Sequence, residues 1–256
     1  MREAVRRNDL TGAERILSEA ARVSPAAALD QLLPAVEDGL EVHRVALPHR
    51  AWELINLVGP AHAFTLLRQS VHYCVVNDGN PKYRDRFQPL RDLLPKVLDQ
   101  HHLVSKPFGS KPADDAWIEK FSQTIFNSTP DAAAEAIGAA LHEGMSPSAI
   151  SEAIATAANL LVLRDPGRPE KYASKEKPAG SVHGDSVGVH ACDAVNALCN
   201  MASVANQRNA AACLILAGYE VANDSSYRRA EFDAYVPHPH PQNLEKISAR
   251  TPAELL

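Results

Sequence analysis

The stretch SPAAALDQLLPAVEDGL, residues 24–40, gives the clearest indication of the fold class. Serine followed by proline is a common start of an α-helix, because the serine side chain can cap the first turn and proline fits the first helical position. After this start, apolar residues recur every four positions, at Ala28, Leu32, Val36 and Leu40. This spacing places them on one face of a helix, so the stretch predicts an amphipathic helix.

The same pattern returns 122 residues later in SPSAISEAIATAANLLV, residues 146–162. Further on, VALPHRAWELINLVG (45–59) corresponds to SVGVHACDAVNALCNMA (186–202), with His49 matching His190 at an offset of 141. The two offsets differ by 19 residues, which we interpret as an insertion covering RDPGRPEKYASKEKPAG, residues 164–180. Two matches in the same order predict an internal duplication.

Composition points to the same fold class. Hydrophobic residues make up 45% of the 256 residues, but aromatic residues only 5%, and alanine is the strongest helix former. We expect an all-α protein, with two related helical repeats packed into one compact domain. Residues 1–80 form the first repeat and 130–222 the second in this prediction. Residues 81–129 are expected to be connecting loops and short helices, and 223–256 an extended C-terminal segment.

The end of the sequence suggests a truncated element. Thr251, Pro252, Ala253 and Glu254 form a capping box with proline at the first helical position, and two leucines follow. A helix start of this kind predicts that the chain is a segment of a longer protein.

Charge and cysteine content limit the classes of partner. A net charge of −5 provides no positive field for nucleic acid. The chain has no apolar run of membrane-spanning length, and its four cysteines form no Cys-x-x-Cys pair. We therefore expect a cytoplasmic protein with free thiols that binds neither nucleic acid nor membrane. A small-molecule substrate or a redox partner protein is the expected partner.

The most unusual segment is SVHGDSVGVHACDAVNALCNMA, residues 181–202. On a helix, its polar residues would share one stripe, surrounded by small apolar residues. Gly184 and Gly188 would allow another backbone or a ligand to come close. Buried polar side chains need partners, which makes this stripe a candidate catalytic site. The candidate residues are His183, Asp185, His190 and Asp193.

The duplication suggests a second set of histidines. If the halves pack about a pseudo-twofold axis, His49 should lie near His190, with His72 joining them. Histidine binds divalent metals such as iron or zinc, so His49, His72 and His190 are the candidate metal ligands. The alternative is structural, with these side chains satisfying one another or neighbouring backbone groups.

Two family resemblances rest on these segments. Residues 144–158, GMSPSAISEAIATAA, resemble the helix-entry pattern of the carboxymuconolactone decarboxylase and alkylhydroperoxidase-D-like families. The Cys-x-x-Cys and downstream histidine of those families are absent, so their peroxidase activity is not implied. The motif SVHGDSVGVHACD resembles that of a family of uncharacterised bacterial all-helical proteins, which are similar to helical regions found beside Rieske-type domains. The chain lacks the Cys/His pairs of a Rieske centre.

Two functions from different classes follow. The first is a metal-assisted oxidoreductase with a pocket lined by histidine and aspartate between the halves. The second is a helical scaffold that binds a partner protein, with structural histidines. A concave pocket with converging polar groups would favour the enzyme, and an exposed apolar groove would favour the scaffold.

Overall fold

The computed structural model describes residues 1–181, 186–236 and 245–254. Across these residues the protein is all-α, 74% helical and without a β-strand, as the composition predicted. None of the described helices combines the length and the apolar character needed to cross a membrane.

The N-terminal half is a bundle in which α3 begins where the sequence predicted. Ala27 N donates to the Ser24 side chain at 3.0 Å, so Ser24 caps α3 with Pro25 in the first helical position. Pro48 lies inside α4. The elements are α1 (Arg2–Arg6), α2 (Leu10–Val23), α3 (Pro25–Val36), α4 (Val42–Val58), η1 (Pro60–His62) and α5 (Ala63–Asp78).

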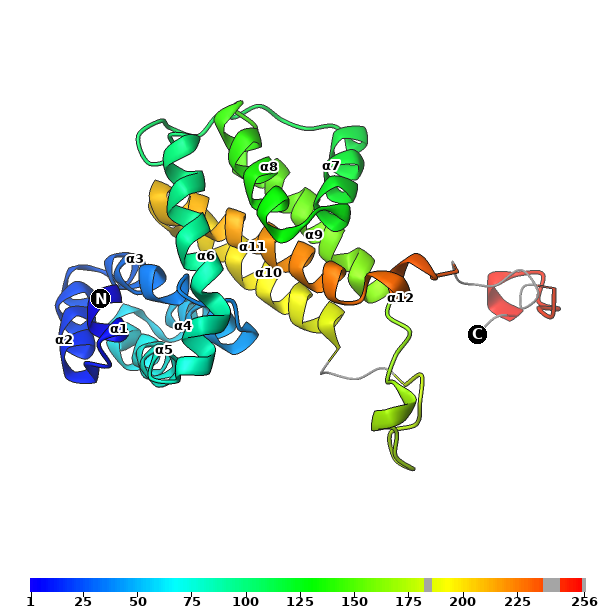
Figure 1. Cartoon of the computed structure of the whole chain (residues 1–256), viewed down its shortest axis with the longest axis horizontal. Coiled ribbons are helices and arrows are strands. Elements are labelled where there is room, and N and C mark those ends of the chain that lie inside the picture. The colour runs from blue at the N-terminus through cyan, green and yellow to red at the C-terminus, as the bar shows by residue number, and fades with distance from the viewer. Residues whose placement is uncertain (182–185, 237–244, 255–256) are drawn as a thin grey trace.

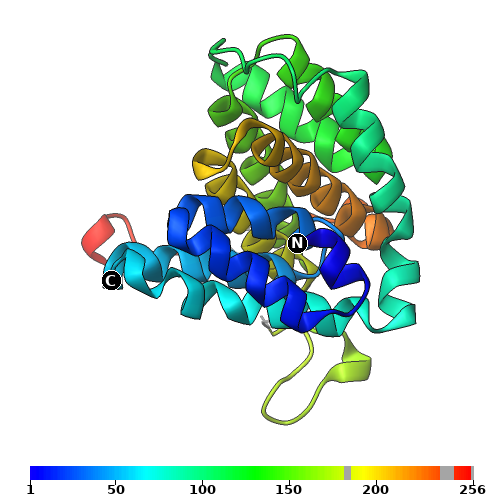
Figure 2. The same cartoon turned by 90° about the vertical axis from the view of Figure 1, so that its left-hand side faces the viewer.

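The long helix α6 (Pro81–Gln100) corrects the expectation of loops and short helices in this region. Asn80 caps it by accepting a hydrogen bond from Lys82 N at 3.0 Å. The two internal prolines each remove one backbone donor, but the helix is kept because one face is buried. The buried residues are Phe87, Leu90, Leu94, Val97 and Leu98. Figures 1 and 2 show α6 running from the first half to the second, in contact with α5, α8 and α11.

The C-terminal half is built around α11, which is buried along most of its length and contacts α7, α8, α9 and α10. We expected an extended segment from residue 223 onward. This expectation is wrong for the first residues of the segment, because α11 continues to Tyr227 and α12 follows it. The elements are α7 (Asp115–Asn127), α8 (Pro130–His142), α9 (Pro147–Leu163), η2 (Glu170–Tyr172), α10 (Val187–Val204), α11 (Gln207–Tyr227), α12 (Arg229–Asp233) and η3 (Pro252–Glu254).

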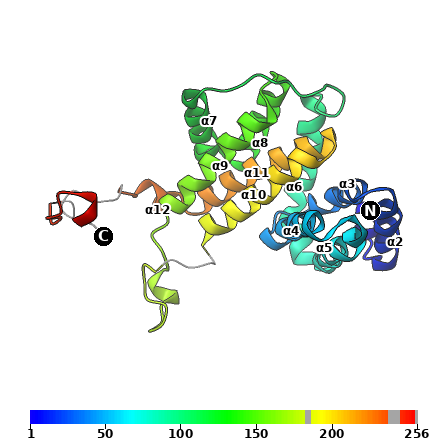
Figure 3. The same cartoon turned by 180° about the vertical axis from the view of Figure 1, so that it is seen from behind.

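The two halves meet where α4 packs against α10 (Figure 3). Behind α10, the end of α9 comes close at Gly188, where an added Cβ would lie 2.8 Å from Val162 N. The sequence-based expectation that Gly188 admits another backbone is therefore confirmed. Gly184 lies outside the described residues.

Candidate ligand pocket

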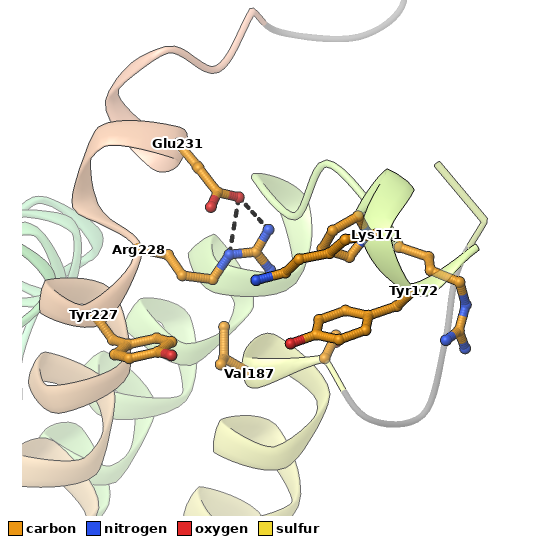
Figure 4. A pocket seen from close by; sticks show the side chains of 9 residues that line it. Lys171, Tyr172, Val187, Tyr227, Arg228 and Glu231 are labelled. Atoms are coloured by element: carbon orange, nitrogen blue, oxygen red, sulfur yellow. Dashed lines mark hydrogen bonds and ion pairs between the residues drawn. The ribbon is translucent and has the colours of Figure 1, made fainter. Parts of the chain in front are cut away.

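A cavity of about 750 Å³ lies at the start of α10, which we call the loop pocket (Figure 4). One wall is the connector between α9 and α10, and the opposite wall is the end of α11 with α12. Its volume falls within the range usual for small-molecule sites. The lining residues are Arg168, Pro169, Lys171, Tyr172, Ser186, Val187, Tyr227, Arg228 and Glu231.

The connector forms a loop whose base is closed by backbone contacts. Arg168 N donates to Ser181 O, and Gly180 N donates to Arg168 O, both at 2.9 Å. Gly167 has a φ of +84°, and an added Cβ would lie 2.4 Å from Gly180 O. Only glycine fits at position 167, so the local sequence fixes the path that brings η2 to the pocket.

The N-terminus of α10 forms the floor of the loop pocket. Ser186 is its N-cap, and its side chain accepts a hydrogen bond from Val189 N at 3.1 Å. Ser186 and Val187 both line the cavity. The N-terminal end of a helix carries a partial positive charge, which favours an anion nearby.

Arg228 is the most tightly held cation of the pocket. Its Nε donates to Glu231 Oε2 at 2.9 Å, and its Nη1 lies 3.5 Å from Asp165 Oδ1. The hydrogen bond with Glu231 is the main cause that raises the pKa of Arg228. These two carboxylates balance its charge, so Arg228 adds little net positive potential.

Arg168 and Lys171 are different, because neither forms an ion pair with a described residue. The Nε of Arg168 is buried without a hydrogen-bond partner among the described residues. Lys171 Nζ lies 4.8 Å from the ring centroid of Tyr172, its neighbour in sequence. The pocket therefore keeps a net positive potential suited to an anionic ligand.

The candidate catalytic residues do not converge within the described part of the chain. His183 and Asp185 lie outside the described residues. His190 is half-buried, and its ring has no hydrogen-bond or ion-pair partner among the described residues. The prediction of a buried stripe is wrong for Asp193, because its side chain is 52% exposed. Its Oδ1 lies 3.9 Å from Nη2 of Arg50 in α4. The buried face of α10 is formed by apolar residues, including Ala191, Ala194, Val195 and Leu198.

The candidate metal ligands also occupy different places. His49 is buried in α4, and its Nε2 lies 3.6 Å from Glu53 Oε1. Burial lowers the pKa of His49, although Glu53 opposes the shift. His72 Nε2 donates a 2.5 Å hydrogen bond to Glu14 Oε1 of α2. No group of three potential metal-ligating side chains occurs among the described residues, so the expected cluster of His49, His72 and His190 is not formed there.

The four cysteines are free thiols, as the sequence predicted. Burial raises the pKa of Cys74 and Cys199 to about 11 and that of Cys213 to about 12. These thiols therefore stay protonated near neutral pH, and a protonated thiol is a poor nucleophile.

Four of the pocket residues were not predicted from the sequence, namely Arg168, Lys171, Tyr227 and Arg228. A signal for the first two was present, because they lie in the insertion between the matched segments. A long insertion that carries several charges is a common place for a binding loop. Tyr227 and Arg228 were missed because the helix that carries them was expected to end before them.

No protein-family model, curated protein or solved structure matches the chain.

Proposed function

We propose that the protein binds a small organic anion in the loop pocket. The observation that carries this proposal is the pair of cations, Arg168 and Lys171, which have no carboxylate partner among the described residues and line a cavity at the start of α10. An anionic group placed there would interact with both side chains and with the partial positive charge of the helix.

The apolar part of the lining indicates what else the ligand carries. Tyr172 and Tyr227 expose 62% and 82% of their surface, and Figure 4 shows Val187 between them. Ring faces exposed at a pocket can stack on an aromatic or flat apolar group. An organic acid with an aromatic body therefore fits the lining better than a bare inorganic anion.

A metal-assisted oxidoreductase stays a prediction that rests on the sequence segment around His190. Its test is the metal content of the purified protein compared with that of His190→Ala. Stoichiometric iron or zinc that is lost in the variant would support it. A metal-free protein that still binds its ligand would instead support a binding protein or an enzyme without a metal.

A scaffold function has one observation in its favour. Three apolar residues at the end of α4 are exposed to solvent: Leu54 by 46% of its surface, Leu57 by 81% and Val58 by 51%. Exposed apolar side chains on one helix end can contact a partner protein. We rank this function second. Leu54 and Leu57 line an open hollow formed by α4 alone, whereas the loop pocket is lined by residues from three segments and includes four charged side chains.

Binding of model anions tests the proposed function. Benzoate and phenyl phosphate should bind by calorimetry, and neutral benzamide should not. Arg168→Gln and Lys171→Gln should each weaken binding about tenfold, which corresponds to about 1.4 kcal/mol. Higher salt should weaken binding as well, because the pocket is open to solvent.

Lys175→Gln is the matched control, since Lys175 is an exposed cation of the same loop that does not line the cavity. It should leave affinity unchanged. Equal binding of benzamide and benzoate, or an equal loss with Lys175→Gln, would contradict the proposal.

A further inference from the structure

Helix α11 carries two carboxylates, Glu220 and Asp224, that do not line the loop pocket. They stand one helical turn apart, so their side chains are neighbours on the same face. Glu220 exposes only 8% of its surface and has no hydrogen bond or ion pair with a described residue. Asp224 accepts a hydrogen bond from Asn223 Nδ2 at 3.4 Å.

One cation and one further carboxylate act on this pair from other helices. Arg86 of α6 is the cation that acts on both carboxylates. Glu41, the N-cap residue of α4, adds its negative charge to that felt by Glu220. On α8, Asp131 acts on the neighbouring Tyr219 instead. Helix α11 contacts α6, and the influence of Arg86 on both carboxylates places the pair on the side of α11 that α6 approaches.

Charging both carboxylates at the same time is energetically costly. Two like charges one turn apart repel, and burial removes the water that would screen them. Burial is the main cause that raises the pKa of Glu220 well above its ordinary value, and Asp224 adds to it. Burial likewise raises the pKa of Asp224 to about 7, although Arg86 opposes the shift.

We propose that the pair of Glu220 and Asp224 releases a proton near neutral pH and that this release loosens the packing of α6 against α11. On release, the O–H bond of the protonated carboxyl breaks and the proton passes to water. The pair then carries a buried negative charge, with the carboxylate of Glu41 nearby and the guanidinium of Arg86 opposing it. The contact between α6 and α11 is part of the junction between the halves, so the junction becomes sensitive to pH.

The direction of the pH effect follows from linkage. The pKa of Asp224 is higher in the folded protein than in the unfolded chain, so the folded state holds an extra proton between the two values. The contribution of this pair to stability is therefore greatest at low pH and falls as the pH rises toward 7. One extra proton corresponds to about a tenfold loss in the folding equilibrium constant per pH unit.

Denaturant unfolding at pH 5 to 8 tests the proposal with the full chain. Asp224→Asn should remove about one proton from the slope between pH 5 and 7 and should be more stable than the wild-type protein at pH 8. His49 and the other titrating groups are common to both proteins, so the difference isolates the pair. Glu119→Gln, at an exposed carboxylate of α7, is the control and should keep the wild-type slope.

A second readout separates loosened packing from a change in stability alone. Amide hydrogen exchange in α6 and α11 should be faster at pH 8 than at pH 6 after correction for intrinsic rates, and Asp224→Asn should abolish this increase. Glu220→Gln serves if Asp224→Asn fails to fold. A wild-type slope in both variants would overturn the release of a proton by the pair. Unchanged exchange between pH 6 and 8 would overturn the loosening.

Discussion

The three helices α3, α4 and α5 and the three helices α9, α10 and α11 follow one another in the same order, but their first connectors differ. Both sets begin with a serine cap and a proline, at Ser24 and Ser146. Residues 37–41 join α3 to α4, whereas residues 164–186 join α9 to α10. The duplication inferred from the sequence stays a prediction, but the comparison locates the main difference between the halves in this connector.

The acidic residues of the short connector form ion pairs with arginines of neighbouring helices. Asp38 accepts two hydrogen bonds from Arg6, at 2.7 and 2.8 Å, and Glu37 pairs with Arg208 of α11. Both acidic residues are buried. Nearby, Asp78 at the end of α5 pairs with Arg44 and Arg91. In this region every buried carboxylate has an arginine partner.

The long connector leaves charges unpaired. Arg168 and Lys171 have no carboxylate partner among the described residues, although both line a cavity. The number of charged residues in a segment therefore does not identify a site. A charged side chain that pairs with an oppositely charged side chain of the protein stabilises the fold. A charged side chain without such a pair is available to bind a ligand.

The largest effect should come from breaking the buried network of the first region. Asp78→Asn removes the acceptor charge from Arg44, which is completely buried, and from Arg91, which is 6% exposed. An uncompensated buried guanidinium should lower the free energy of unfolding by about 3–5 kcal/mol. Chemical denaturation measures this loss. A loss below about 1 kcal/mol would show that the pair is solvated and that the comparison between connectors fails.

A smaller effect on stability, but a large effect on binding, is expected from the base of the long connector. Gly167→Ala should cost about 1–3 kcal/mol locally, because the new Cβ adds a clash with Gly180 O to the strain of a positive φ. Gly180→Ala is the matched control, since its φ is +75° but an added Cβ would meet nothing within 4 Å. Binding of phenyl phosphate should be lost in the first variant and largely kept in the second. Equal binding by both would show that the loop base does not shape the pocket.

The fold class could be predicted from the sequence because helix starts and apolar spacing are local signals. Ser24-Pro25 and Ser146-Pro147 both cap helices as expected. The error at α6 has a physical reason: turn-forming residues around Pro81 resemble a loop, but burial of Phe87 and Leu90 against distant segments keeps the helix. Such tertiary contacts cannot be read from a short stretch of sequence.

The candidate site was harder to predict, because it depends on which charges find partners. The sequence predicted a buried polar stripe through His190 and Asp193, but helical spacing alone did not reveal that Asp193 is exposed. Lys171 and Tyr227 are 56 positions apart in the sequence and line the same cavity. No local pattern joins residues at this separation.

The smallest effect should follow from Asp193, the exposed member of the sequence-predicted site. Its carboxylate lies 3.9 Å from Arg50 across the contact between α4 and α10, and both side chains are more than half exposed. An exposed pair at this distance contributes little, because solvent and salt screen it. Asp193→Asn should therefore change the free energy of unfolding by less than about 0.5 kcal/mol, and a double-mutant cycle with Arg50→Gln should give a coupling of similar size. Binding of phenyl phosphate in the loop pocket should be unchanged. A loss of binding or of bound metal in Asp193→Asn, with stability intact, would place Asp193 at a functional site and restore the segment around His190 as the leading candidate.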